Sequence, residues 1–146
     1  MKTKAERYNE LYIDIALRIA EMSYATRLHV GAVLVKDNNI ISFGWNGMPS
    51  GWDNTCEYEE LDEYGEYTIL KTKPEVLHAE QNALMKLAKS TSSSLDSEMY
   101  ITHAPCVDCA KLICQSGVNS IFYRNAYRDD SGIELLKKAG INVNKI

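Results

Sequence analysis

The chain has 146 residues, of which 45% are hydrophobic and 25% are charged, and its net charge is −4. This length is typical of a single domain, residues 1–146, built around one hydrophobic core. The negative charge argues against general binding to nucleic acid, which needs a basic face, but it permits a small anionic substrate held by a few local cations.

The N-terminal segment shows neither an export signal nor a membrane anchor. Residues 1–23 alternate charged and apolar side chains at helical spacing, without the continuous apolar run of a signal peptide. No stretch approaches the roughly 18 apolar residues of a membrane span. We therefore expect a cytoplasmic protein (in the host cytoplasm if it is viral) with no membrane partner. Thiols stay reduced there, so the four cysteines are metal ligands or core residues before they are disulfides.

The N-terminal half predicts a helix followed by a β-hairpin. The helix presents one apolar face with i, i+3, i+4, i+7 spacing, formed by Tyr8, Leu11, Tyr12, Ile15, Ile19 and Met22. Two β-branched runs, Val30–Val35 and Ile40–Phe43, then flank Asp37-Asn38-Asn39, whose residue types suit a tight turn. From Gly47 to Thr72 no period is visible, which is typical of a long functional loop.

The C-terminal half alternates helices with short strands. Its predicted elements are a helix in HAEQNALMKLAK, a strand at Met99–Thr102, a helix through Cys106–Ser116 opened by Pro105, a strand at Ser120–Tyr123, a helix at Ile133–Ala139 and a strand at Ile141–Val143. With the hairpin, this order predicts an α/β fold: a mixed five-stranded sheet in a three-layer α/β/α sandwich.

Two short motifs carry the candidate chemistry. Pro105-Cys106-Val107-Asp108-Cys109 places two thiols three residues apart on the first turn of a helix, where unpaired N–H groups and the helix dipole stabilise thiolates. His78-Ala79-Glu80 supplies an imidazole. Two thiolates and one imidazole make three zinc ligands and leave the fourth tetrahedral position open, as in catalytic zinc sites.

Glu80 lies two residues after His78 in the first turn of its predicted helix. Side chains in that turn can lean over the helix end and flank a metal there. A carboxylate beside a metal-held water can take its proton and pass it to the substrate, which is general acid–base catalysis. H-x-E with P-C-x-x-C is the signature of zinc deaminases acting on nucleobases.

Other interpretations of the thiol pair remain open. It could be a redox pair, or part of a closed zinc site in a non-catalytic binding module. A closed site needs a fourth protein ligand, which could come only from His29, His103, Cys56 or Cys114.

The chain resembles the cytidine deaminase superfamily and, within it, the deoxycytidylate (dCMP) deaminases, including those of phages. The matching stretches are VGAVLV, GWNG, HAEQNAL, THAPCVDCAKLICQSGV and YRNAYRDDSGIELLKKAGI. The resemblance implies a cytidine-deaminase-like fold, Zn²⁺ held by His78, Cys106 and Cys109, and Glu80 as proton shuttle. The implied reaction is hydrolysis of dCMP at C4 to dUMP and ammonia, which supplies dUMP for dTTP synthesis.

The resemblance also implies how the substrate is held. Asn46 would hydrogen-bond the sugar, and the backbone at Ala104 would accept from the exocyclic amine. Tyr123 and Tyr127, at the end of the predicted strand Ser120–Tyr123 and beyond it, lie close to where a base would sit, and of the two we choose Tyr127 to pack on it. The 5′-phosphate needs cationic or N–H partners. The candidate cations are Arg27, Lys73, Arg124 and Arg128.

Regulation and assembly are further implications of the resemblance. Gly44-Trp45-Asn46-Gly47 resembles the regulatory motif of allosteric members, in which tyrosine stands where this chain has Trp45. The implied effectors are dCTP as activator and dTTP as inhibitor, with Mg²⁺ on the triphosphate, and the implied assembly is a homohexamer. A tRNA adenosine deaminase, or a cytosine, guanine or riboflavin-pathway deaminase, would share the zinc motifs. Recognition of tRNA would need a positive surface, against which the net charge of −4 argues.

Overall fold

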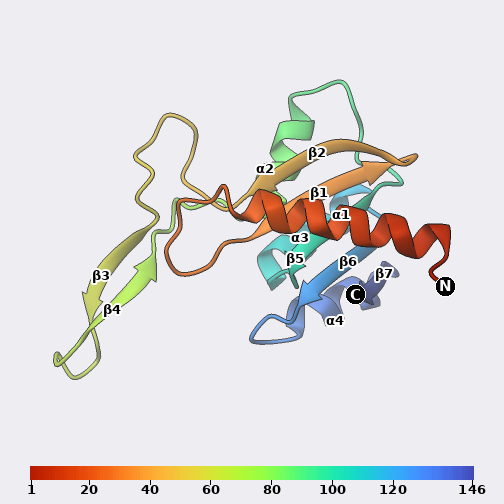
Figure 1. The fold of residues 1–146 in the computed structure, drawn as a ribbon. Helices are drawn as coiled ribbons and strands as arrows, with labels where there is room; N and C mark the ends of the chain where they lie inside the picture. The colour runs from red at the N-terminus through yellow and green to blue at the C-terminus, as the bar shows by residue number, and fades with distance from the viewer.

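A computed structural model describes residues 1–146 and shows helices and strands alternating along most of the chain (Figure 1). The elements are α1 (Lys4–Ala20), β1 (Gly31–Lys36), β2 (Asn39–Trp45), β3 (Glu57–Leu61), β4 (Thr68–Thr72), α2 (Ala79–Ala88), β5 (Glu98–His103), α3 (Val107–Ser116), β6 (Ser120–Asn125), α4 (Ser131–Lys138) and β7 (Asn142–Lys145). None of these helices has the length and apolarity needed to cross a bilayer.

The main sheet is mixed and five-stranded, as predicted. Its strand order is β2-β1-β5-β6-β7, with β1 antiparallel to β2 and β5, and β5, β6 and β7 parallel to one another. The predicted hairpin is confirmed as β1–β2. Asp37 and Asn38 form its turn with φ values of 50° and 61°, a left-handed conformation that Asp and Asn adopt more readily than other side chains.

Helices cover both faces of this sheet, which confirms the three layers. Because successive side chains of a strand point to opposite faces, Ala32 and Leu34 join a core with α2, α3 and α4, whereas Val33 and Val35 pack against α1. Figure 1 shows α1 crossing one face of the sheet, with α2 and α3 on the other.

The predicted apolar face of α1 is confirmed in part: Tyr12 is buried, and Tyr8, Ile15 and Ile19 pack against the same core. Ile13, Ala16 and Ala20 are buried, whereas Leu11 and Met22 are each 49% exposed. The helix ends at Ala20, so Met22 lies beyond it. The small side chains at Ala16 and Ala20 let the helix lie close to the sheet, and this contact with β1 and β5 sets the buried face. Counting only large apolar residues missed the part that Ala16 and Ala20 play in this face.

Strands β3 and β4 pair into a separate two-stranded hairpin that the sequence did not predict. We call residues 57–72 the arm, because they extend away from the main sheet (Figure 1). Apart from Glu57, the residues of both strands are exposed. Strands exposed on both faces need no alternation of apolar and polar residues, so this segment carries no period that could have revealed them.

Candidate active site

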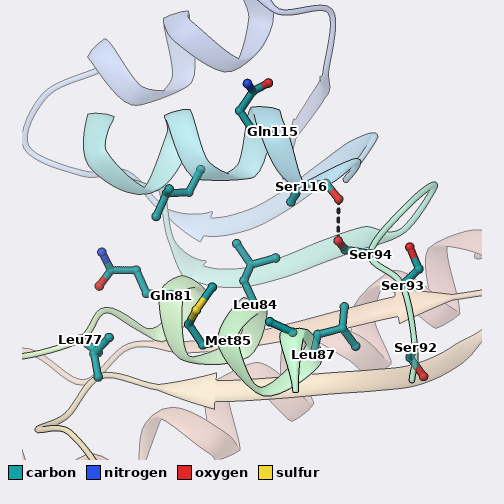
Figure 2. Close-up of a pocket in the computed structure, with 12 residues that line it drawn as sticks. Leu77, Gln81, Leu84, Met85, Leu87, Ser92, Ser93, Ser94, Gln115 and Ser116 are labelled. Atoms are coloured by element: carbon teal, nitrogen blue, oxygen red, sulfur yellow. Dashed lines mark hydrogen bonds between the residues drawn. The ribbon is translucent and has the colours of Figure 1, made fainter. Parts of the chain in front are cut away.

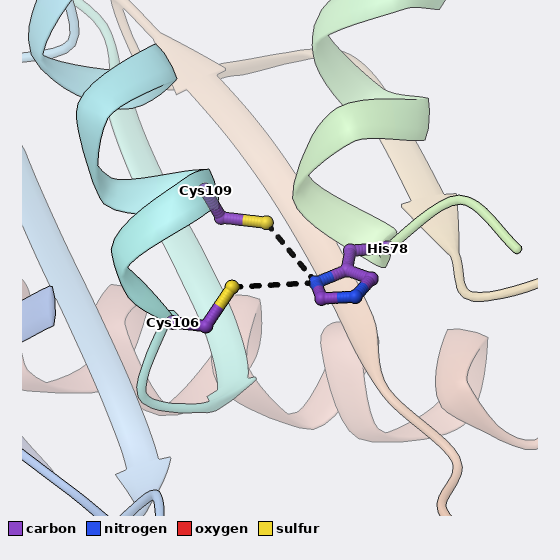
Figure 3. Close-up of side chains that lie close together, drawn as sticks. All are labelled: His78, Cys106 and Cys109. Carbon is purple, nitrogen blue, oxygen red and sulfur yellow. Dashed lines mark hydrogen bonds between the residues drawn. The ribbon is translucent and has the colours of Figure 1, made fainter. Parts of the chain in front are cut away.

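His78, Cys106 and Cys109 come together where two helices begin (Figure 3). His78 is the N-cap residue of α2, Cys106 is the N-cap residue of α3, and Cys109 lies in the first turn of α3. His78 Nδ1 lies 3.2 Å from Cys109 Sγ and 3.6 Å from Cys106 Sγ. The three donor atoms lie within 4.8 Å of one another. The structure therefore joins the two motifs that are separate in the sequence.

These donors fit a zinc ion. Zinc binds sulfur at about 2.3 Å and imidazole nitrogen at about 2.0–2.1 Å, so a tetrahedral site separates the two donors by about 3.6 Å. The separations of 3.2 and 3.6 Å lie close to that value. Three protein donors of this kind leave one tetrahedral position for water or substrate.

The residues that could have closed the site lie in other contacts. The His29 ring bonds the carbonyl of Ala25, and the His103 ring bonds the Thr102 hydroxyl. Cys56 is buried, with its thiol near the carbonyl of Asn54. Cys114 packs against the main core from the far half of α3. The group of donors close enough to share one ion consists of His78, Cys106 and Cys109.

The three donors hydrogen-bond one another, and a bound cation would change their protonation states. Hydrogen bonds with Cys109 and His78 lower the pKa of the Cys106 thiol to about 4. The hydrogen bond to Cys106 and burial raise the pKa of the Cys109 thiol, and the bond to Cys106 raises the pKa of His78. One thiolate thus forms in the protein alone. A divalent ion would favour both thiolates and a neutral imidazole, and the two helix N-termini favour negative charge at the same place.

Glu80 lies in the first turn of α2 and is only 4% exposed. Burial raises the pKa of its carboxyl group above the usual value, and the nearby His78 and Cys109 offset only part of that rise. The ion pairs of the chain do not include it. A buried carboxyl group beside the donors, with a raised pKa, is suited to taking up and releasing a proton.

The loop between β5 and α3 is supported by two residues that sequence reasoning missed. Asn125 accepts a hydrogen bond from the Ala104 N–H (2.8 Å), and its side chain donates to the Thr102 carbonyl (2.9 Å). Gly132 lies in the first turn of α4, where a Cβ atom would lie 2.1 Å from the Pro105 oxygen. Only glycine allows this approach of α4 to the donor loop. Its one sequence signal is a glycine directly before the predicted helix at Ile133–Ala139.

Asn46 connects the end of β2 to the loop before β1. Its Oδ1 accepts from the Val30 N–H at 2.9 Å, and its Nδ2 donates to the Leu28 carbonyl at 2.8 Å. The next residue, Gly47, exchanges two backbone hydrogen bonds with Leu77, of 3.0 and 2.8 Å. Because Leu77 directly precedes His78, the GWNG turn lies alongside the metal donors.

The other residues of this turn are held from α2. A Cβ atom on Gly44 would lie 2.6 Å from the Ala83 nitrogen, so glycine lets α2 pack closely on β2. The carbonyl of Trp45 accepts from Asn82 Nδ2 at 2.7 Å. The Trp45 ring stacks on Phe43, and Lys86 Nζ lies 4.1 and 5.1 Å from the Phe43 and Trp45 ring centres. Trp45 thus belongs to an aromatic and cationic surface beside the turn.

The structure also places Tyr127 and the candidate cations. Tyr127 lies between β6 and α4 and packs against the core formed with α2, α3 and α4. The Arg128 guanidinium lies 5.5 Å from its ring centre. Arg27 Nη1 donates to the Thr72 hydroxyl at 3.1 Å. Arg124 instead donates to the carbonyl of Ile146. Of these cations, Arg27 is next to the loop residues that Asn46 binds.

A groove of about 600 Å³ lies between α2 and α3. Figure 2 shows Leu84, Met85 and Leu87 of α2 facing the groove, with Gln115 and Ser116 of α3 across it. Neither the three donors nor Glu80 line it. This hollow is therefore separate from the candidate active site.

Comparisons with known proteins give a matching family and a similar solved structure. Residues 6–125 match the family described as the cytidine and deoxycytidylate deaminase zinc-binding region. The crystal structure of the dCMP deaminase from the cyanophage S-TIM5, in complex with dCMP and dUMP, is 44% identical. The alignment covers 100% of this chain and 99% of that chain, with a TM-score of 0.86.

Two relatives extend the comparison to other sources. The deoxycytidylate deaminase of Enterobacteria phage T4 is 32% identical over 90% of this chain and 86% of its own length. ComE operon protein 2 of Bacillus subtilis is 31% identical over 95% of this chain and 71% of its own length. The family match spans both halves of the donor set, from His78 to Cys109. The chain therefore belongs to the cytidine and deoxycytidylate deaminase family.

Proposed function

We propose that this protein is a zinc-dependent dCMP deaminase, which converts dCMP to dUMP and ammonia and so supplies the dUMP used for dTTP synthesis. The observation that carries the proposal is the convergence of His78, Cys106 and Cys109 beside the buried carboxyl group of Glu80. The similarity to a cyanophage dCMP deaminase along the whole chain supports this choice of substrate.

The three donors and Glu80 divide the chemistry between them. A zinc ion on His78, Cys106 and Cys109 would polarise a water molecule and lower its pKa from 15.7 to about 7. Glu80 would take one proton from the attacking water and deliver it to N3 of the cytosine ring while the water oxygen bonds to C4. It would then pass the remaining water proton to the exocyclic amine, so that the C4–N bond breaks, ammonia leaves and the C4 carbonyl forms. The carbonyl of Ala104 accepts from the exocyclic amine, on a segment that Asn125 holds in place.

Asn46 can contact the sugar while it keeps its own position. Its amide nitrogen carries two hydrogens and its oxygen two lone pairs, and the fold uses one of each for Leu28 and Val30. The remaining hydrogen and lone pair are available to a hydroxyl group of the deoxyribose. Tyr127 packs on the base from the loop before α4.

The enzyme should strongly prefer dCMP to deoxycytidine, because phosphate contacts add binding energy that the nucleoside lacks. We place Arg27 at the phosphate, since its loop is bound directly to Asn46. A hydrogen bond to a charged group contributes about 1.5–3 kcal/mol, so kcat/KM for dCMP should exceed that for deoxycytidine by about tenfold or more. Steady-state kinetics of ammonia release on both substrates measures this ratio.

Arg27→Gln should reduce that preference, whereas Arg124→Gln is the matched control, because its guanidinium is bound to the chain end. Equal efficiency of the wild type on dCMP and deoxycytidine would reassign the protein as a cytidine deaminase.

We further propose feedback control through the GWNG turn, with dCTP activating and dTTP inhibiting as their Mg²⁺ complexes. Asn46 faces the sugar, and Trp45 with Lys86 forms the adjoining aromatic and cationic surface, so a shift of this turn would change substrate affinity. Coupling of this kind typically changes affinity about 5–150-fold. The curve of rate against dCMP concentration should move to lower dCMP concentrations with dCTP·Mg²⁺ and to higher ones with dTTP·Mg²⁺. Hyperbolic curves that neither nucleotide moves would leave GWNG as a substrate-binding turn.

Control of this kind needs two global states, which an oligomer supplies, and we propose a homohexamer. The α2–α3 groove supports contact between copies, because Met85 and Leu112 are 57% and 43% exposed beside it. Light scattering on the same samples should give six times the chain mass of 16.5 kDa.

A further inference from the structure

Two adjacent loop residues are held by the first pair of residues in the arm. Glu57 and Thr72 face each other across β3 and β4. The Glu57 carboxylate accepts from the Thr26 N–H at 2.6 and 3.1 Å. The Thr72 hydroxyl accepts from Arg27 at 3.1 Å. The arm is therefore fastened to the loop between α1 and β1 at two neighbouring points.

Glu57 is the buried acid of the arm, with 7% of its surface exposed. The ion pairs of the chain lie elsewhere, so no cation pairs with it. Burying a carboxylate is costly unless hydrogen bonds compensate for the lost water. Glu59, two residues further along the same face of β3, is exposed. Burial thus distinguishes Glu57, whose carboxylate binds the Thr26 N–H, from an exposed acid of the arm such as Glu59.

The opposite side of the same loop is bound by Asn46. Its carbonyl accepts from the Ser23 hydroxyl at 2.7 Å, and its side chain binds the backbone of Leu28 and Val30 at 2.8 and 2.9 Å. Residues 23–30 are therefore held between the arm and the GWNG turn. That turn also pairs with Leu77, which precedes His78. A chain of hydrogen bonds therefore connects the arm, the loop, the GWNG turn and the segment that carries His78.

We propose that Glu57 is a positioning residue for the nucleotide. It holds the loop at residues 23–30 against Asn46, so that the sugar and phosphate end of the substrate meets a preformed surface. The role of Asn46 in this inference rests on the proposed function. Release of the loop should weaken binding of the nucleotide and leave the chemistry at the donors and Glu80 intact.

Glu57→Ala should raise KM for dCMP about tenfold, because it removes a hydrogen bond to a charged group; a tenfold change corresponds to about 1.4 kcal/mol. The value of kcat should stay within about twofold, with zinc content unchanged. Glu57→Gln keeps an oxygen acceptor for the Thr26 N–H and should restore most of the loss. Glu59→Ala is the matched control and should change neither constant.

A second measurement follows the loop itself. Trypsin cleaves after Arg27, which is exposed, and it needs a flexible segment to do so. Glu57→Ala should speed cleavage between Arg27 and Leu28, whereas Glu59→Ala should not. Thr72→Val removes only the outer contact, on an exposed residue, and should raise KM in the same direction by a smaller factor.

The outcomes separate the inference from the function on which it rests. An unchanged KM in folded Glu57→Ala overturns the inference, and so does a fall in kcat that merely follows lost zinc or lost folded protein. If Glu57→Ala does not fold, Thr72→Val decides, and an unchanged KM there also overturns it. If Glu57→Ala is cleaved faster by trypsin but no protein, including the wild type, turns over dCMP, the loop contact is upheld and the proposed substrate is rejected.

Discussion

Glu80→Gln should abolish dCMP turnover while the protein keeps its fold and one zinc per chain. Glutamine matches glutamate in shape, so the first turn of α2 can keep its packing. Its amide cannot accept a proton from water, nor donate one to N3. Each acid–base role is worth on the order of 10²–10⁴-fold in rate. Ammonia release, zinc content and circular dichroism of the same preparation measure the three properties.

Glu75→Gln provides the matched control, because Glu75 is an exposed acid shortly before the same helix. It should retain the wild-type rate. If Glu80→Gln also retained a near wild-type rate, Glu80 would not be the proton shuttle. If Glu80→Gln lost its zinc as well, the carboxylate would be acting on the metal site and not on the proton.

Cys106→Ala should lose both the metal and the activity. The thiol of Cys106 is the one already disposed to ionise, with a pKa of about 4, and it begins α3, where the helix dipole favours a thiolate. Without it, one sulfur and one imidazole remain, fewer than the three protein ligands of catalytic zinc sites. Elemental analysis after gel filtration measures zinc per chain, and the deaminase assay measures the accompanying loss of rate.

The control is Cys114→Ala, a change of the same size in the same helix. Cys114 packs against the main core and is not one of the grouped donors. This variant should keep one zinc and the wild-type rate. Activity in protein that contains no zinc would contradict the whole interpretation of the site.

The features that could be predicted from the sequence are those set by neighbouring residues. Asp37 and Asn38 favour the left-handed turn of the β1–β2 hairpin by their own side chains. His78, Cys106 and Cys109 occupy helix starts that the spacing of their motifs already indicates. The helices show the period that comes from burying one face, whereas the central strands β1 and β5 are buried on both faces and show as short apolar runs.

The features that could not be predicted depend on contacts between distant segments. Glu57 is buried only because Thr26, 31 residues earlier, approaches it. Gly132 matters only because α4 packs on Pro105. In a sequence these residues look like an ordinary acid and an ordinary glycine. The arm was not predicted for a related reason. Neither of its faces is buried, so its sequence has no alternation of apolar and polar residues that would indicate strands.

The charge of the arm limits how copies of this chain can meet. The arm's residues, 57–72, contain six acids and one base, a net charge of −5, so the remaining residues together carry +1. An exposed hairpin that displays Leu61, Ile69 and Leu70 offers unpaired strand edges to other hairpins, which is a route to aggregation. Repulsion between two such acidic arms opposes that pairing at neutral pH. An ordered assembly would therefore bring together surfaces other than two arms, and salt or acid would weaken the protection that keeps the arms apart.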